Sequence, residues 1–196
     1  RPSLLPLALA SIRQSNDTYV LLSSPPLSQD QTVMIQRFLD EGLIDEVIVE
    51  PTSGNLSSKI QHAIDSLPLG IQYVGWLGDD DLLTPNAIGL AVAELEKNRK
   101  SVLVYGNCQY IDAEGRELFL NTPGMLGAKI LGWGPQLIPQ PGALWRRDTF
   151  DAIGGLSADL EMAFDYDLFL RLKAAGDVSY IPETLASFRW HADSLS

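Results

Sequence analysis

Helix patterns and strand patterns alternate regularly through the first half of the chain, and this order limits the folds that it can adopt. Apolar residues recur at helical spacing, and they predict helices over residues 4–13, 29–41, 56–66 and 84–97. Runs rich in strand-forming residues separate these helices, at 18–23, 46–50 and 73–77. Strands that alternate with helices are typical of a mainly parallel central sheet flanked by helices. We therefore expect an α/β fold.

The second half of the chain is less regular and predicts mixed strands. A strand over 101–110, a turn at 112–115 and a returning run at 116–120 form a predicted hairpin. The Gly- and Pro-rich stretch 121–141 is expected to be a long loop, or a short helix with turns. Further predictions are strands at 143–145, 178–181 and 185–190 and helices at 148–153 and 165–175. Because the chain has 196 residues and no dividing linker, we expect a single domain.

The composition excludes some classes of partner. A formal net charge of -11 argues against nucleic acid, because proteins that bind its phosphates are usually basic. The single cysteine, Cys108, lies in a Val- and Tyr-rich run, which predicts an inert buried thiol. We expect neither a transmembrane helix, which needs ~20 apolar residues, nor a secretory signal. The expected location is cytoplasmic, with peripheral association at the inner face of the membrane as an alternative.

Three consecutive aspartates, Asp79, Asp80 and Asp81, follow the strand predicted at 73–77 and precede a helix that Thr84 is expected to cap. Ligands of open α/β sheets collect at the carboxyl ends of strands. Adjacent carboxylates repel one another unless a cation or hydrogen bonds compensate, and hard oxygen ligands suit Mg2+ or Mn2+. The cluster therefore predicts a metal site shared with substrate phosphates. The alternative is an acidic flank of the following helix, stabilised by the helix dipole.

Two further groups could carry chemistry. Asp165 and Asp167 open a predicted helix and point to different sides of its first turn, so at most one would face a cleft. The alternative is that both are acids that merely stabilise the start of the helix. Arg189 and His191 share one face of the last predicted strand, where a basic pair can contact a diphosphate. The alternative there is a solvated strand end.

The segment Gly75–Ile88, which contains the three aspartates, resembles the acidic-motif region of the family 2 glycosyltransferases, which have the GT-A fold. Other segments resemble that family in the same order: 1–12, 104–107 with 111–115, 154–156 with 165–172, and 188–191 with Ser194. Each motif is weak alone, but together they are specific, and the similarity spans nearly the whole chain.

The resemblance implies a role for individual residues. Asp80 matches the main metal ligand, and His191 matches a position that assists metal or diphosphate binding. Asp165 matches the general base of the inverting members. The remaining positions implied to bind the donor or to brace its site are Asp79, Asp81, Gly54, Lys59 and Arg189.

The implied activity is metal-dependent transfer of a sugar, with inversion, from a nucleoside-diphosphate sugar to an acceptor hydroxyl. The acceptor would be a carbohydrate or a lipid-linked sugar, and the setting would be bacterial surface polysaccharide or glycoconjugate synthesis. The donor would bind within about residues 1–100, and the acceptor within about residues 101–196. Two alternatives stay open: a nucleotidyltransferase of similar architecture, and a non-catalytic nucleotide-sugar-binding relative.

The sequence departs from the family pattern in four places. The strand that precedes the first helix in the family is not found before Arg1, and the acidic residue usual after the second strand is replaced around residues 23–26. Gly78 stands where many members carry an aspartate, and Phe164 where a glutamate often precedes the base. The first two departures bear on nucleotide recognition, whereas Asp80 and Asp165 are retained.

Overall fold

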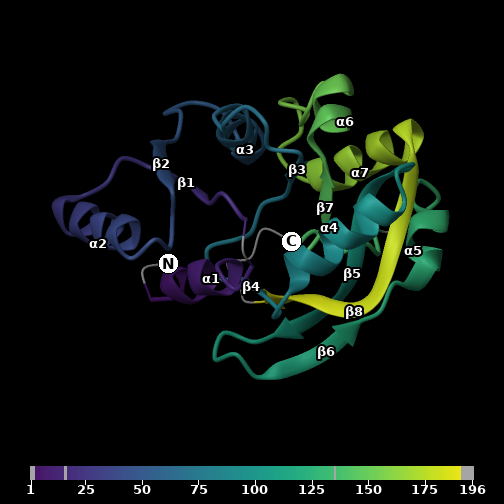
Figure 1. Cartoon of the computed structure of the whole chain (residues 1–196), viewed down its shortest axis with the longest axis horizontal. Helices are drawn as coiled ribbons and strands as arrows, with labels where there is room; N and C mark the ends of the chain where they lie inside the picture. The colour runs from purple at the N-terminus through teal and green to yellow at the C-terminus, as the bar shows by residue number, and fades with distance from the viewer. Residues whose placement is uncertain (1–2, 16, 135, 191–196) are drawn as a thin grey trace.

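The computed structural model describes residues 3–15, 17–134 and 136–190 (Figure 1). The helices within these ranges are α1 (Leu5–Ile12), α2 (Gln29–Asp40), α3 (Leu56–Asp65), α4 (Ala87–Lys97), α5 (Gly124–Ile130), α6 (Arg147–Ala152) and α7 (Phe164–Ala175). The strands are β1 (Leu21–Ser24), β2 (Glu46–Val49), β3 (Tyr73–Val74), β4 (Leu82–Leu83), β5 (Ser101–Ile111), β6 (Glu117–Asn121), β7 (Leu144–Arg146) and β8 (Asp177–Arg189).

The first part of the chain forms a small lobe around two parallel strands. β1 and β2 pair in register from Leu21↔Glu46 to Ser24↔Val49. α2 starts with a capping box, in which the Ser28 side chain and the Gln31 side chain each bond the backbone of the other. Apolar side chains of α1 and α2 pack on the strands in a cluster of their own, whose buried members are Leu9, Val20, Ile35, Phe38 and Ile44. Figure 1 shows β1, β2 and α2 on one side of the molecule, apart from the larger sheet.

The larger sheet has six strands among the described residues and is mixed. Its order is β3-β7-β5-β8-β4, with β6 beside β5. Only β5 and β8 pair in parallel within it, and the other pairs are antiparallel. The α/β class and the hairpin are confirmed, but the expectation of a mainly parallel central sheet is wrong for this sheet. Alternation along the chain reveals where crossovers occur, but it does not reveal that β3 lies beside β7, which arrives from the second half in the opposite direction.

β8 is one long strand where the sequence predicts two. It runs through Pro182, which has no N–H to donate to a neighbouring strand. The register of β5 against β8 shifts on both sides of Asn107. Where the register shifts, the Asn107 side chain links the two strands. Its Nδ2 donates to the carbonyl oxygen of Pro182 at 3.1 Å, and its Oδ1 accepts from the Tyr180 hydroxyl at 2.6 Å.

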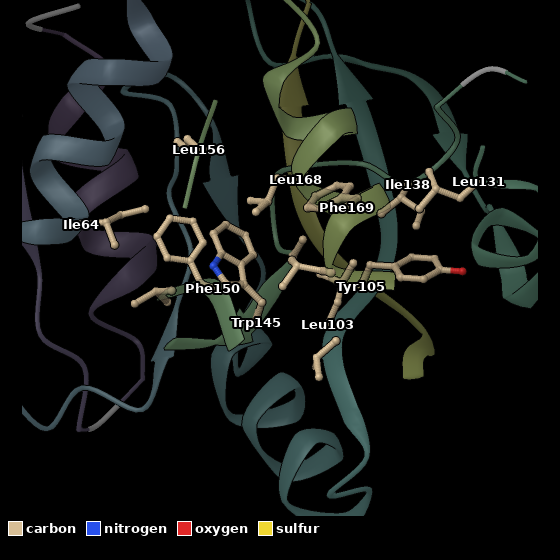
Figure 2. Close-up of a cluster of buried hydrophobic side chains, with 14 residues drawn as sticks. Ile64, Leu103, Tyr105, Leu131, Ile138, Trp145, Phe150, Leu156, Leu168 and Phe169 are labelled. Atoms are coloured by element: carbon tan, nitrogen blue, oxygen red, sulfur yellow. The ribbon is translucent and has the colours of Figure 1, made fainter. Parts of the chain in front are cut away.

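Helices cover both faces of the larger sheet. α4 packs on one face, in a cluster built with Val104, Ile181 and Leu185. α7 packs on the other face through Leu168, Phe169 and Leu172. Its partners there are Leu103 and Tyr105 of β5 and Trp145 of β7. Figure 2 shows this second cluster, with the Trp145 and Phe150 rings side by side and Phe169 next to Ile138. The alternation of β5 side chains between the two faces explains its almost complete burial.

The start of α4 differs from expectation. Thr84 does not cap the helix, because its hydroxyl donates instead to the carbonyl oxygen of Thr184 in β8 at 2.6 Å. The residue before the helix is Asn86, which has a left-handed backbone with φ of 63°. Leu82 and Leu83 form the short strand β4 beside β8, and this pairing takes Thr84 away from the helix.

Candidate active site

The three consecutive aspartates lie in the loop between β3 and β4, and their exposure falls along the loop. Asp79 is exposed, Asp80 is half-buried, and Asp81 is only 4% exposed. The Asp81 N–H donates to the carbonyl oxygen of Gly78 at 3.3 Å and closes a tight turn. A Cβ atom on Gly78 would lie 2.9 Å from Asp81 Oδ2, so the glycine leaves room for that carboxylate. The loop thus buries Asp81, leaves Asp79 exposed and holds Asp80 between these extremes.

The buried acid is the most perturbed titratable group of this loop. Burial raises the pKa of the Asp81 carboxyl to about 7; the negative charges of Asp80 and Asp79 add to the increase, and a hydrogen bond from the Arg189 N–H opposes it. Burial likewise raises the pKa of the Cys108 thiol to about 12, with a smaller contribution from Asp81. Cys108 is fully buried, which confirms the prediction of a buried thiol.

Arg189, at the end of β8, ties the acidic loop to the β5–β6 hairpin. Its N–H donates to Asp81 Oδ1 at 2.9 Å, and its Nε donates to the carbonyl oxygen of Asp80 at 3.1 Å. Its Nη1 donates to the carbonyl oxygens of Asp112 and Ala113 at 2.9 and 3.1 Å. Arg189 is buried, with 5% of its surface exposed. The predicted contact with a diphosphate stays a prediction, and the observed contacts make Arg189 a clamp for the loop.

Asp165 lies in the first turn of α7 and is half-buried. Its Oδ2 accepts a hydrogen bond from Gln136 Nε2 at 2.8 Å, and its Oδ1 accepts one from the Tyr166 N–H at 2.9 Å. Asp167 is used differently, because its Oδ2 binds the Arg171 guanidinium at 2.7 and 2.9 Å. Of the two acids, Asp165 faces the loop that contains Gln136.

Aromatic rings connect the start of α7 to the segment that leads into the acidic loop. The Trp76 ring lies 6.0 Å from the Phe164 ring and 5.0 Å from the Trp145 ring, centroid to centroid. Gln140 Nε2 donates to the carbonyl oxygen of Trp76 at 2.8 Å. Trp76 thus lies three residues before Asp79, and its ring neighbour Phe164 immediately precedes Asp165. The structure therefore joins the two predicted acidic groups through one packed contact.

Sequence reasoning missed the two glutamines that support this site. Gln136 and Gln140 both lie in the stretch expected to be a long loop, where no periodic pattern gives a side chain a direction. One signal was available: they are polar residues among Gly, Pro and apolar neighbours. That composition does not reveal their partners, because those partners lie 29 and 64 residues away in the sequence.

Gly54 and Lys59 lie at the start of α3, and local contacts account for both. Gly54 has φ of 99°, in the left-handed region that favours glycine, and a Cβ atom there would collide with the Ser58 hydroxyl. Lys59 Nζ forms an ion pair with Glu50 at 2.9 Å. Their predicted contacts with the donor stay predictions.

The donor set of the acidic loop fits a hard divalent cation that is shared with a substrate. Among the described residues, no three His, Cys, Asp or Glu side chains are grouped to hold a metal ion by themselves. Mg2+ commonly uses only one or two carboxylates and completes its shell with water and substrate phosphates. The half-buried Asp80 carboxylate meets that requirement, whereas Asp81 Oδ1 is already bonded to Arg189. His191, the other predicted ligand, lies outside the described residues.

Two open surface depressions lie elsewhere on the molecule. One, of about 310 Å³, is lined by α4 and by β8 residues such as Ile181 and Pro182. The other, of about 540 Å³, lies at Gln72, Tyr73 and Arg146. Neither is lined by Asp80 or Asp165, so the hydrogen bonds and packing contacts given above characterise the candidate site.

The chain is similar in sequence to several glycosyltransferases and polysaccharide synthases. No family model matches the chain. The chain is 25% identical over 151 residues to an uncharacterized glycosyltransferase of Rickettsia conorii, covering 74% of this chain and 25% of that protein. It is 24% identical over 151 residues to the chondroitin synthase of Pasteurella multocida, covering 76% of this chain and 15% of that one. The chain therefore spans a quarter or less of the length of these relatives.

Solved glycosyltransferase structures superpose on nearly the whole chain. The structure of TarS from S. aureus in complex with UDP has a TM-score of 0.71 at 12% identity, over 96% of this chain and 57% of that one. The mannosyltransferase PcManGT from Pyrobaculum calidifontis, in complex with GDP-Man and Mn2+, has a TM-score of 0.69 at 11% identity, over 100% of this chain and 55% of that one. The chain has the GT-A fold of these proteins, which confirms the predicted fold class.

None of the described helices is both long enough and apolar enough to cross a membrane.

Proposed function

We propose that this chain is the catalytic domain of a glycosyltransferase, which moves a sugar from a nucleoside-diphosphate sugar to an acceptor hydroxyl. The observation that supports this most is the joining of Asp165 to the acidic loop through Trp76 and Phe164, within the GT-A fold. Relatives of the chain are named glycosyltransferases, and structural neighbours hold UDP or GDP-Man.

Asp165 would act as the general base. Its Oδ2 is oriented by Gln136 and its Oδ1 by the backbone of Tyr166, so the carboxylate is held in one rotamer before substrate binds. A carboxylate in this position can accept the proton of an acceptor hydroxyl as that oxygen attacks the anomeric carbon. Attack from the side opposite the departing nucleoside diphosphate gives inversion of configuration.

Asp80 would bind Mn2+ or Mg2+ together with the donor diphosphate, and His191 would complete the protein ligands. The cation, when bound, neutralises charge that grows on the leaving diphosphate. Asp79, the most exposed of the three acids, would contact the ribose or the sugar. Asp81 and Arg189 would hold the loop in shape through the contacts described above.

The relatives suggest a setting for the reaction. Chondroitin and hyaluronan synthases of Pasteurella multocida are among the proteins that the chain resembles. We therefore place the activity in the synthesis of bacterial surface polysaccharide or glycoconjugate, at the cytoplasmic face of the membrane, with a carbohydrate or lipid-linked acceptor.

The test is the release of nucleoside diphosphate from a panel of UDP- and GDP-sugars, with Mn2+ or with a chelator, combined with thermal-shift measurements. A transferase should release nucleoside diphosphate when the correct donor and an acceptor are present, and the donor should raise the melting temperature only with the metal. Asp80→Ala should abolish both responses and keep the fold. Release of pyrophosphate from a nucleoside triphosphate would instead identify a nucleotidyltransferase. Donor binding without any release would identify a non-catalytic relative.

A further inference from the structure

Trp133 is among the most exposed large apolar side chains of the molecule, with 91% of its surface open to solvent. Its immediate neighbours in sequence are Gly132, whose φ of 97° favours glycine, and Gly134. Single exposed apolar residues are common on protein surfaces, so exposure alone does not indicate a function. The contacts that hold the backbone on both sides of Trp133 provide the second observation.

The segment that carries Trp133 is anchored on both sides. Leu131 and Ile138 are buried in the cluster beneath α7, as Figure 2 shows. The Lys173 ammonium of α7 donates to the carbonyl oxygen of Leu131 at 3.0 Å. The Trp133 N–H donates to the carbonyl oxygen of Ile130 at 2.8 Å. The tryptophan is therefore presented to solvent by a segment that is itself packed.

A single hydroxyl group connects this segment to the proposed base. The Tyr166 hydroxyl accepts from the Gly132 N–H at 3.2 Å and donates to the carbonyl oxygen of Gly134 at 3.0 Å. It thus bonds the residues on both sides of Trp133, and Tyr166 itself follows Asp165 directly in α7. Gln136, further along the same segment, donates to Asp165 Oδ2 at 2.8 Å. Two independent links therefore fix the backbone that carries Trp133 relative to the carboxylate.

We infer that Trp133 is the platform on which a sugar ring of the acceptor stacks, and that Tyr166 is the residue that positions it. This inference rests on the proposed function. The face of an indole is electron-rich, and the C–H groups on one face of a pyranose ring carry partial positive charge, so the two surfaces attract one another and shed water together. A rigid aromatic side chain also loses little conformational entropy on binding. An acceptor held there would present a hydroxyl toward Asp165.

The test measures the binding of an acceptor separately from its reaction. Chondroitin and hyaluronan tetrasaccharides serve as probes, since relatives of the chain are named as synthases of these polymers. Their affinity for the parent protein, Trp133→Ala and Trp133→Phe is measured by saturation-transfer NMR titration. Trp133→Ala should lower the affinity about tenfold or more, and Trp133→Phe should restore most of it. Tyr166→Phe, which keeps the indole but removes both hydroxyl contacts, should give an intermediate loss.

Leu69→Ala is the matched control, because Leu69 is also a fully exposed apolar residue and lies outside this segment. It should bind the tetrasaccharides as the parent does. Equal affinities of Trp133→Ala and the parent, or no binding of either tetrasaccharide by the parent, would overturn the inference. The proposed function fails on a different readout: the parent would release no nucleoside diphosphate from any sugar nucleotide, whether or not the tetrasaccharides bind.

Discussion

Asp165 and Asp167 are separated by one residue, and their contacts give them different chemistry. Asp165 accepts hydrogen bonds from two neutral N–H donors, the Gln136 side chain and the backbone of Tyr166. Asp167 is neutralised by Arg171, whose guanidinium also holds the carbonyl oxygens of Ile153 and Gly155. A carboxylate that must take a proton from an acceptor cannot be committed to an arginine. Of the two acids, Asp165 is therefore the better candidate for the proposed base.

Asp165→Asn should lower the rate of sugar transfer by about a hundredfold or more and leave donor affinity nearly unchanged. Asparagine keeps the size of the side chain and can still accept from Gln136, but it cannot accept a proton. Steady-state transfer rates and donor thermal shifts provide the measurement. Asp167→Asn is the control and should cost at most about 1 kcal/mol of stability, because its ion pair is partly exposed. Parent-like transfer by Asp165→Asn would show that the base lies elsewhere.

Asp81 should make the stability of the metal-free protein depend on pH. Its pKa is about 7 in the folded protein, above the 3.8 of an unperturbed carboxyl, so the folded state binds the proton more tightly. Stability is therefore highest below about pH 4 as far as this group is concerned, and it falls as the pH rises to about 7. The charged or titratable groups that act on the carboxyl are those of Asp79, Asp80, Cys108, Tyr110 and the Arg189 guanidinium, and the Arg189 N–H also bonds it.

Asp81→Asn should remove this dependence, because the amide stays neutral and its oxygen can still accept from Arg189. With a chelator present, we compare the effect of Asp81→Asn on the free energy of unfolding at two pH values. The substitution should be more favourable at about pH 8 than at about pH 4, by about 2–4 kcal/mol. Urea unfolding at the two pH values measures the difference. An equal effect of the substitution at both would show that Asp81 is not protonated in the folded state.

The sequence predicted the acidic site residues from motifs, and it missed those recognisable only by their partners. Asp80 and Asp165 are conspicuous because acids cluster after a strand or at the start of a helix. Trp76, Gln136 and Gln140 carry no such pattern, and their roles depend on segments that meet only in the folded chain. Arg189 was predicted to bind a ligand, and nothing in its local sequence indicated that carbonyl groups of two loops would surround it.

At the scale of elements, β8 connects the core to the candidate site. It pairs with β5 and with β4, and its last residue, Arg189, bonds the acidic loop and the hairpin at once. Most element types were predictable, because the periodic patterns are strong. The ends of elements were not, since tertiary contacts decide them: Pro182 lies inside β8, and Thr84 bonds β8 instead of capping α4.

Arg189→Lys should distinguish a clamp from a ligand contact. Lysine keeps the charge but cannot reach the carbonyl oxygens of Asp80, Asp112 and Ala113 together, so buried acceptors lose their donors. We expect a loss of about 2–4 kcal/mol in the free energy of unfolding without ligand. Chemical denaturation checks the stability, and donor titration checks the affinity. Parent-like stability together with weakened donor binding would instead favour the diphosphate contact. Arg37→Lys, at an exposed ion pair with Glu41 in α2, is the control.

At the scale of the whole molecule, several of the described strands have an unpaired edge, and those of β1 and β3 matter here. Within the described ranges, β1 pairs only with β2 and β3 only with β7. The free edge of a strand can accept another strand through its backbone N–H and C=O groups. The family resemblance implies a strand ahead of the first helix, and we propose that such a strand would join the two sheets.

A version of the protein extended before Arg1 should therefore bind its donor more tightly than the chain described here, and it should melt at a higher temperature. The added strand would complete one wall around the nucleotide base. Donor titration and thermal melting of both versions check this. Equal, micromolar donor affinity in the two versions would contradict the proposal.

The first lobe has an apolar cluster of its own, and this affects how the protein unfolds locally. Its buried residues, which include Leu9, Phe38 and Ile44, contact one another and not the clusters beneath α4 and α7. A cluster that is shared by few elements can melt locally while the remainder stays native. Amide hydrogens of β1, β2 and α2 should thus exchange with solvent before those of β5 and β8. A nucleotide sugar that touches both regions would couple their unfolding, so their amide hydrogens would exchange together. The loss of the difference in exchange between the two regions would then report that the donor is bound.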